Sequence, residues 1–408
     1  MTRQRIEFIF LNIGHFFDHL FMLVFAAVAA LVLAGEWSMS YAELIPYATP
    51  GFIAFGLFGL PAGWIGDKWS RQGMMAVFFI GAGACSILTG MAQTPLGIGA
   101  GLFAIGVFAA IYHPVGLALV IHGRTNTGMA LALNGVFGNI GTAGAALIAG
   151  FFIDLSGWRA AFVLPGAASI LTGIAYSAFV LKTRERAAAA RAKAADEAAA
   201  RAARAPAPAI DRHVLMRVFA IIFFSTAMGG LIYQSTTFAM PKVFDERLSD
   251  LAGSASLVGG YVFIALTIAS IGQLTVGYLI DRHSIRTVFA AIAVMQAGFA
   301  AVLLQLSGTA MLVTCALLMA AVFGQLPIND ALVGRITRSE WRSRAIALRY
   351  VVTIAAMSLA IPLIAWIHAR WDFSVLFFVL AGAAGLTLTA VLMLPRISVV
   401  TGGAVAAE

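Results

Sequence analysis

Long apolar runs dominate the chain, and its polar residues collect in the shorter segments between them. An α-helix needs about 20 predominantly apolar residues to cross the hydrocarbon core of a bilayer. Twelve runs reach about that length, so the pattern predicts an all-α membrane protein with twelve transmembrane helices. The expected spans are residues 7–34, 43–66, 73–93, 96–122, 126–153, 158–181, 214–240, 254–280, 287–306, 309–333, 344–369 and 373–394.

A polar segment rich in alanine and arginine separates the first six spans from the last six. We therefore expect an N-terminal six-helix bundle over 1–181, a cytoplasmic linker over 182–213, a C-terminal bundle over 214–396 and a cytoplasmic tail over 397–408. Three markers recur in the two bundles at nearly one interval: Asp67 and Asp281, Pro114 and Pro327, and Trp158 and Trp371. Such a repeat predicts two pseudo-symmetric halves in parallel orientation, with a solute site between them.

The composition fits a membrane protein and argues against several other classes. Hydrophobic residues make up 61% of the chain and charged residues 11%, whereas soluble domains average roughly 45–50% and 25%. The two cysteines, Cys85 and Cys315, both lie in apolar runs and indicate neither a disulfide framework nor a cysteine metal site. No G-x-x-x-x-G-K-[ST] loop occurs, so direct drive by ATP is not supported. No segment between the spans is long enough for a catalytic domain, and we do not expect an enzyme.

The excess of 26 basic over 18 acidic residues is explained by topology. If the N-terminus is cytoplasmic, only Arg159, Lys242, Arg247 and Arg370 fall on the outer side. This asymmetry follows the rule that Lys and Arg concentrate in cytoplasmic loops. We therefore expect a multi-pass protein of the bacterial inner membrane with both termini in the cytoplasm. Its basic segments would contact membrane lipids, and no nucleic-acid partner is expected.

The loop after the second span contains "GWIGDKWSR" at residues 63–71. Gly63, Asp67, Lys68 and Arg71 match the loop signature G-x-x-x-D-[RK]-x-G-R-[RK], and on this account the chain resembles the major facilitator superfamily. A carboxylate at a helix end can pair with basic residues and with the N-terminus of a neighbouring helix. We therefore expect a latch that forms in one transport state and breaks in the other. The second half repeats the motif in "GYLIDRHSIR", with Asp281, Arg282 and Arg286 as its charged residues.

Two further stretches, "GHFFDH" in the first span and "AAIYHPVG" in the fourth, are similar to the fosmidomycin-resistance-like branch of that superfamily and its bacterial relatives. The resemblance implies a fold of two six-helix bundles that work by alternating access. It also implies that spans 1, 4, 7 and 10 line a central cavity.

The first span carries a polar face. His15, Asp18, His19 and Met22 recur at helical spacing and so share one side. A charged residue at the centre of a span costs about 2.5–3.5 kcal/mol on insertion scales, so it usually faces a polar cavity. We expect Asp18 and His113 to carry the coupling proton, with His15, His19 and Met22 among the substrate contacts. In the alternatives, Asp18 makes a structural hydrogen bond, or this face binds a transition metal through imidazole, carboxylate and thioether groups.

Both halves are expected to contribute further substrate contacts. The seventh span has uncharged polar residues where the first has Asp18, so the second half would recognise solute by hydrogen bonds. Arg349 either attracts an anionic substrate or pairs with Asp330. Asn134 and Asn139 either donate to substrate or join two helices. The additional predicted substrate-binding residues are Tyr112, Asn134, Tyr233, Gln234, Thr237, Arg349 and Tyr350.

The sequence thus predicts a secondary transporter that moves a small organic solute, coupled to protons. Antiport with export is favoured over symport with uptake. Two alternatives stay open: transport of a transition metal or metal chelate, and a receptor or assembly protein that uses a transporter scaffold without transporting. No cofactor is expected, and the protein is expected to be monomeric.

Overall fold

The computed structural model describes residues 2–122, 124, 127–194, 212–336, 339–394, 397–399 and 405–407. Within these ranges, twelve helical segments are long and apolar enough to cross a membrane, so the twelve predicted spans are confirmed. The principal helices are α1 (Arg3–Val28), α4 (Thr49–Lys68), α5 (Arg71–Gly90), α6 (Pro95–Ala109), α8 (Thr127–Ser156), α9 (Ala160–Ala194), α10 (Arg212–Arg247), α11 (Ala255–Ile280), α12 (Ile285–Val302), α13 (Gly308–Ile336), α14 (Ser339–His368) and α15 (Phe373–Leu392).

Three spans are completed by short helical pieces. A π-helical turn, η1 (Ala29–Leu33), and α2 (Ala34–Glu36) extend α1. The second span begins with α3 (Tyr41–Leu44) and a 3₁₀ turn, η2 (Ile45–Ala48), before α4. The fourth span breaks after α6 into a second π-helical turn, η3 (Tyr112–Gly116), and then α7 (Leu117–Ile121). Single π turns of this kind occur often at functional sites.

Polar side chains at the helix starts fix where the spans begin. Ser40 and Glu43 form a reciprocal capping box at α3, which satisfies backbone N–H groups that no helical carbonyl can reach. Ser70, Thr94, Ser254 and Asp372 cap α5, α6, α11 and α15 through their side-chain oxygens. These short polar interruptions turn one continuous apolar chain into separate helices.

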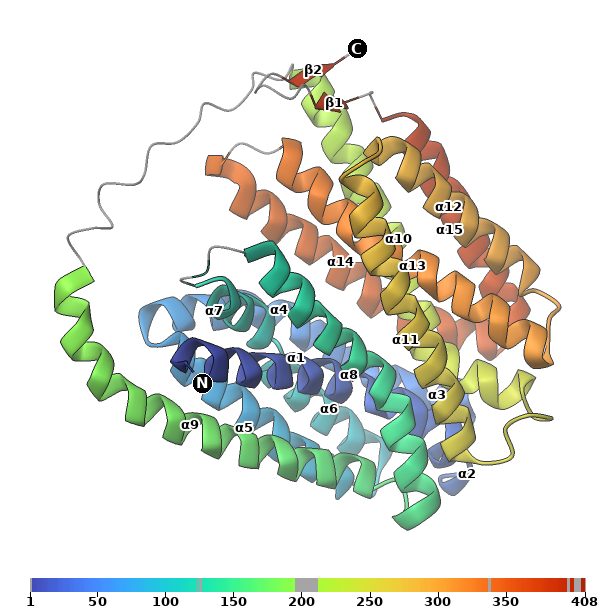
Figure 1. Cartoon of the computed structure of the whole chain (residues 1–408). Helices are drawn as coiled ribbons and strands as arrows, with labels where there is room; N and C mark the ends of the chain where they lie inside the picture. The colour runs from blue at the N-terminus through green and yellow to red at the C-terminus, as the bar shows by residue number, and fades with distance from the viewer. Residues whose placement is uncertain are drawn as a thin grey trace.

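The two halves repeat one packing scheme (Figure 1). In the first half α1 packs on α8, α4 on α6, and α5 on α9. The corresponding pairs in the second half are α10 with α14, α11 with α13, and α12 with α15. The internal repeat read from the sequence therefore corresponds to two pseudo-symmetric six-helix bundles.

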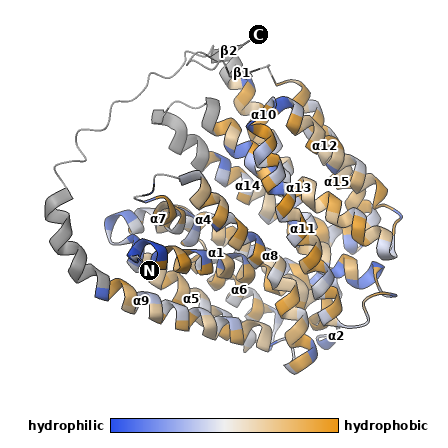
Figure 2. Ribbon diagram, viewed as in Figure 1, coloured by the Kyte–Doolittle hydropathy of each residue, from blue (hydrophilic) through white to orange (hydrophobic). Residues whose placement is uncertain are grey.

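Hydrophobic residues make up most of each long helix, and hydrophilic ones gather mainly at helix ends and in the connecting segments (Figure 2). Large side chains such as Leu57, Leu60 and Trp64 on α4 are exposed. In a soluble protein an apolar surface of this extent would be a liability. Here it is the surface that lipid covers.

The bundles meet where α8 packs antiparallel to α11. A Cβ added at Gly150 would lie 2.2 Å from the carbonyl oxygen of Ala255, and one at Gly259 would lie 2.3 Å from that of Ala146. Both contacts lie toward the end of the bundle where α8 ends and α11 begins. The helices approach so closely there because glycine leaves room for the backbone.

Part of the predicted domain scheme lies outside the described residues. These parts are 195–211 of the linker, the tail residues 400–404 and 408, and residues 1, 123, 125, 126, 337, 338, 395 and 396 of the two bundles. The described remainder of the tail holds a small antiparallel pair of strands, β1 (Ile397–Val399) and β2 (Val405–Ala407). Apart from this hairpin, the regular structure of the described residues is helical.

Candidate functional site

The polar face of α1 points into the first bundle. Asp18 is 1% exposed and His15 6%, while His19 is partly buried. Met22 packs against the surrounding hydrophobic core. The face predicted from helical spacing is therefore turned away from lipid. Neighbouring groups inside the bundle must offset the free-energy cost of burying its polar side chains.

His113 supplies the partner of Asp18. Its Nε2 lies 3.3 Å from Oδ2 of Asp18, and the His113 side chain is 21% exposed against 1% for the carboxylate. Neither oxygen of Asp18, nor Nδ1 of His113, has a hydrogen-bond partner, so the pair is held by charge and proximity. The sequence thus identified two groups that the fold brings into contact, although their role in coupling stays a prediction.

The π turn η3 sets the position of His113. Pro114 has no backbone N–H, so a regular helix through this point would lose a hydrogen bond. The wider turn accommodates the proline, and a Cβ added at Gly63 of α4 would approach Pro114 to 3.2 Å. The fourth span thus passes from α6 to α7 through a local π helix.

His15 and His19 form a hydrogen-bonded pair one turn apart. Nδ1 of His15 lies 2.8 Å from the carbonyl oxygen of Asn134, and the two Nε2 atoms lie 3.1 Å apart. Nδ1 of His19 lies 3.1 Å from the hydroxyl of Thr142, which in turn lies 3.2 Å from the carbonyl of Gly138. Thr142 was not predicted as a site residue. Its only sequence signal is a hydroxyl within the glycine-rich run of the fifth span.

Tyr112 and Asn134 belong to a second buried network. The Tyr112 hydroxyl donates to the carbonyl of Leu11 at 2.8 Å. The Asn134 amide donates to Tyr112 at 2.9 Å and to Asn12 at 2.9 Å. Together these bonds join α1, η3 and α8, so in this conformation both side chains serve helix contacts. Their contact with substrate stays a prediction.

Glycine at position 138 is required by the site. A Cβ there would lie 2.6 Å from Nε2 of His15. We expect Gly138→Ala to destabilise the protein by about 1–3 kcal/mol, as overpacking does, or to displace the imidazole. Gly135→Ala, on the same helix with open space around it, should be neutral or stabilising by up to about 1 kcal/mol. Thermal unfolding of the two variants measures the difference, and equal behaviour would contradict the tight contact.

The second half presents polar groups on α10. Gln234 is 1% exposed, and its amide nitrogen has no partner. Thr237 donates to the carbonyl of Tyr233 at 2.7 Å, and the Tyr233 ring packs beside Phe323 at 5.3 Å between centroids. Tyr350 of α14 lies 6.0 Å from the His113 ring. Of these predicted residues of the second half, Tyr350 is the one whose ring contacts His113 of the first half.

Arg349 pairs with Asp330, which was one of the two alternatives for this residue. The arginine side chain is 11% exposed and the aspartate 66%. The guanidinium also lies 5.5 Å from the centre of the Tyr350 ring. Nε of Arg349 is buried without a partner, so one donor of the group is unpaired in this conformation.

The predicted latch residues are placed at the helix ends. Asp67 accepts from Arg71 of its own loop, at 2.7 Å from Nη2 and 3.0 Å from Nε. Lys68 is the last residue of α4. In the second half Arg286 donates to the carbonyl of Leu392 at 2.6 Å. Asp281 is the C-cap of α11, and Arg282 lies over the Tyr278 ring at 3.5 Å.

The opposite end of the bundle holds contacts that the sequence reading did not anticipate. The backbone N–H of Ser256 donates to Asp154 at 2.8 Å, so a carboxylate of the first half caps a helix of the second. His368 pairs with Glu246 at 3.0 Å, and its ring packs on Tyr41 of the first half at 5.3 Å. Nearer the middle, Asn139 donates to Gln273 at 2.7 Å, which is the expected hydrogen bond between two helices.

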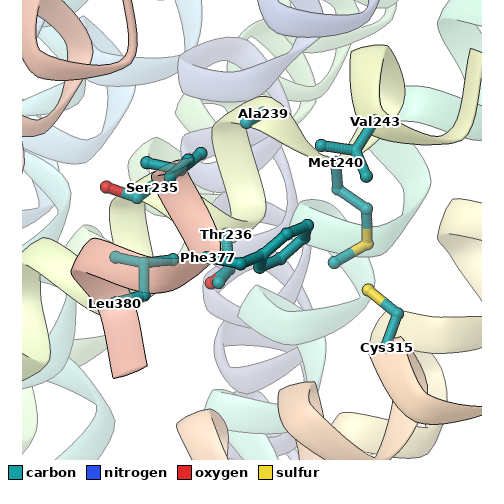
Figure 3. Close-up of a pocket in the computed structure, with 9 residues that line it drawn as sticks. Ser235, Thr236, Ala239, Met240, Val243, Cys315, Phe377 and Leu380 are labelled. Atoms are coloured by element: carbon teal, nitrogen blue, oxygen red, sulfur yellow. The ribbon is translucent and has the colours of Figure 1, made fainter. Parts of the chain in front are cut away.

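The second half also contains a small pocket between α10, α13 and α15 (Figure 3). Its empty space is about 270 Å³, part of it open to the outside. Met240 and Cys315 turn their sulfur atoms toward one another there. The lining is mainly apolar and without charge, so it does not resemble the polar site in the first half.

Comparison with known proteins decides the family. The family model described as Major Facilitator Superfamily matches residues 11–318 and 248–405. The chain belongs to the major facilitator superfamily. It is therefore a multi-pass membrane protein of a family of transporters rather than of enzymes.

Individual relatives are more distant. A probable actinorhodin transporter of Streptomyces coelicolor is 29% identical over 140 residues, which cover 32% of this chain. The matched region spans about a quarter, 24%, of that relative. A POT family transporter solved with 5-aminolevulinic acid superposes with a TM-score of 0.73 at 12% identity, covering 95% of this chain and 94% of that one.

Two other solved structures share the fold. An inward-facing, unoccupied bacterial homologue of the lysosomal transporter Spinster has a TM-score of 0.69 at 14% identity, covering 97% of this chain and 95% of that one. A D-xylose–proton symporter has a TM-score of 0.70 at 14% identity, covering 95% and 97%. Because these sequence identities are low, the likenesses show only that this superfamily member shares the fold of those proteins.

Proposed function

We propose that this superfamily member moves a small organic solute across the bacterial inner membrane by alternating access, coupled to protons through Asp18 and His113. The observation that carries the proposal is the contact between a carboxylate 1% exposed and an imidazole 21% exposed inside the membrane. A buried carboxylate is favoured in its neutral form unless a cation is beside it. Proton uptake and loss at this pair would therefore change the charge of the cavity.

The solute would bind between the halves, next to the coupling pair. Tyr350 is the group of the second half that lies beside His113, and Arg349 keeps a buried, unpartnered donor. Gln234 likewise has an unpaired amide nitrogen. Under the proposal, these groups and His15 and His19 exchange their present contacts for contacts with the solute. Export by antiport is favoured over uptake by symport.

The described contacts suggest which face is open. The halves are joined by Asp154 and Ser256 and by the glycine contacts of α8 and α11 at the end opposite the N-terminus. Asp67 meanwhile bonds within its own loop. We propose that this conformation is closed on the outer side and open toward a cytoplasm that holds both termini. In the opposite state the loop at 63–71 would latch the cytoplasmic side.

A second candidate function has one observation in its favour. His15, His19 and His113 bring one ring nitrogen each within 4.8 Å of the others. Metal transport would thus use a different set from the one expected on α1 alone, with His113 in place of Asp18 and Met22. Met22 packs against the core.

The test of the proposal uses purified protein in liposomes. A thermal-stabilisation screen over drugs, carboxylates, amino acids and sugars first identifies solutes that bind, because a ligand raises the melting temperature by mass action. A stabilising solute should then move against its concentration gradient when a pH gradient is imposed. Movement that responds to a membrane potential but never to pH would overturn proton coupling. A non-transporting receptor would bind solute and move none.

A further inference from the structure

We infer that the first bundle contains a binding site for one divalent transition-metal ion of the zinc class, formed by His15, His19 and His113. The site is the histidine set of the second candidate function, but metal binding there requires neither proton coupling nor solute transport. Two of the three ligands share α1, and the third comes from η3 in the fourth span. The ion would therefore bridge two spans of one half.

The geometry of the three imidazoles suits such an ion. One ring nitrogen of each lies within 4.8 Å of the other two, and the Nε2 atoms of His15 and His19 are already 3.1 Å apart. Tetrahedral zinc with bonds of about 2.0–2.1 Å holds its ligand nitrogens roughly 3.3 Å apart. His15 and His19 stand at i and i+4, which is the usual spacing for two ligands on one helix.

The outer contacts fix which nitrogen of each ring is available. A backbone carbonyl can only accept, so the contact of Nδ1 of His15 with Asn134 places a proton on Nδ1 and a lone pair on Nε2. The carboxylate of Asp18, 3.3 Å from Nε2 of His113, favours a proton on that nitrogen by its charge, which leaves the lone pair on the buried, unpartnered Nδ1. Metal-binding histidines almost always have such an acceptor on the other nitrogen.

His19 completes the set through Thr142. The hydroxyl of Thr142 lies near both Nδ1 of His19 and the carbonyl of Gly138. Without metal, the hydroxyl donates to His19, which then donates from its own Nε2 to His15. With metal, the proton of His19 moves to Nδ1 and the hydroxyl turns to Gly138. Both Nε2 lone pairs then face the ion, and no ring changes its charge.

The charge of Asp18 and the chemistry of the three imidazoles also favour a cation at this site. Asp18 is a buried carboxylate whose oxygens have no other partner, so a positive ion next to its histidine offsets its charge. Three imidazoles would fill three of the four positions of a tetrahedral ion, while Asp18 stays outside the coordination sphere. The fourth position would be open to water or another ligand, as in zinc sites with three protein ligands. Imidazole is a good ligand for zinc, copper, nickel and cobalt.

The test is direct metal binding by the full-length protein, purified with a tag that contains no histidine and stripped of metal. Cobalt(II) serves as the probe, since a four-coordinate nitrogen site gives it visible absorption, and zinc should then displace it. We expect one ion per chain. His19→Gln and His113→Gln should abolish the signal, and Thr142→Val, which removes only the outer contact, should weaken binding roughly 10- to 100-fold.

Two matched variants control for general effects. His122→Gln removes an exposed histidine elsewhere, and Met22→Leu alters the core next to the site; both should bind cobalt as the wild type does. Thermal unfolding without metal shows which variants are folded. A folded wild type that binds no cobalt, or binding that survives His19→Gln, would overturn the site. Such a protein could still transport solute in a pH gradient, so this failure is distinct from failure of the proposed function.

Discussion

Asp18→Asn is expected to abolish proton-driven accumulation of solute and to leave exchange of solute without a gradient close to wild type. Asparagine keeps the size and hydrogen-bonding shape of the side chain but cannot bind and release a proton. Since one pH unit corresponds to about 1.4 kcal/mol, coupling to one proton supports about a tenfold concentration ratio at that gradient. The variant should reach a ratio of about one.

The measurement compares accumulation with counterflow exchange in the same liposomes. Asp245→Asn is the control, because Asp245 is a half-exposed carboxylate paired with Lys242 at the far end of α10. It should retain the wild-type ratio. If Asp18→Asn concentrates solute as well as the wild type does, the coupling site is elsewhere. If it also loses exchange while remaining folded, Asp18 acts in solute binding rather than in coupling.

The sequence predicted the parts of this molecule that depend on composition and helical period. Apolar length alone located all twelve spans. Helical spacing placed His15, Asp18 and His19 on one buried face, and the repeated markers predicted two similar bundles. The pair of Asp18 and His113 also followed, because a buried charge needs a partner and the fourth span offers few candidates.

The remaining features depend on how neighbouring helices are rotated and shifted, which the period of one helix does not determine. Thr142 contributes to the histidine network only because α8 turns its hydroxyl toward α1. Asp154 lies just beyond the predicted fifth span, 126–153, yet it caps α11 across the interface. The π turn at Tyr112–Gly116 also escaped prediction. Proline predicts a disturbance of the helix there, but not the form that it takes.

The polar chemistry of the described residues is distributed unequally between the halves. The first half holds the buried carboxylate and the three clustered imidazoles. On α10, which repeats α1, Thr236 and Thr237 donate to backbone carbonyls of their own helix. Under the proposed function, the first half therefore carries the charge changes, and the second half selects the solute.

The glycines between α8 and α11 allow a direct test of alternating access, because substitution there should shift the equilibrium between the two conformations of the protein. Gly259→Ala should drive the protein out of the present conformation, because the new Cβ would lie 2.3 Å from the carbonyl oxygen of Ala146. That atom belongs to the backbone and cannot move aside as a side chain can. A cost of about 1–3 kcal/mol that is confined to one state shifts the equilibrium by about 5- to 150-fold.

Gly260→Ala is the matched control, since the neighbouring glycine has open space around it and the same substitution there should leave the equilibrium unchanged. Distances between spin labels attached near Asp154 and Ser254 report separation of the halves at this end. We expect a longer distance for Gly259→Ala and the wild-type distance for Gly260→Ala. Solute exchange should slow in Gly259→Ala because the closed state is rarely reached. Identical label distances in the two variants would show that α8 and α11 do not separate, and that the transport cycle opens elsewhere.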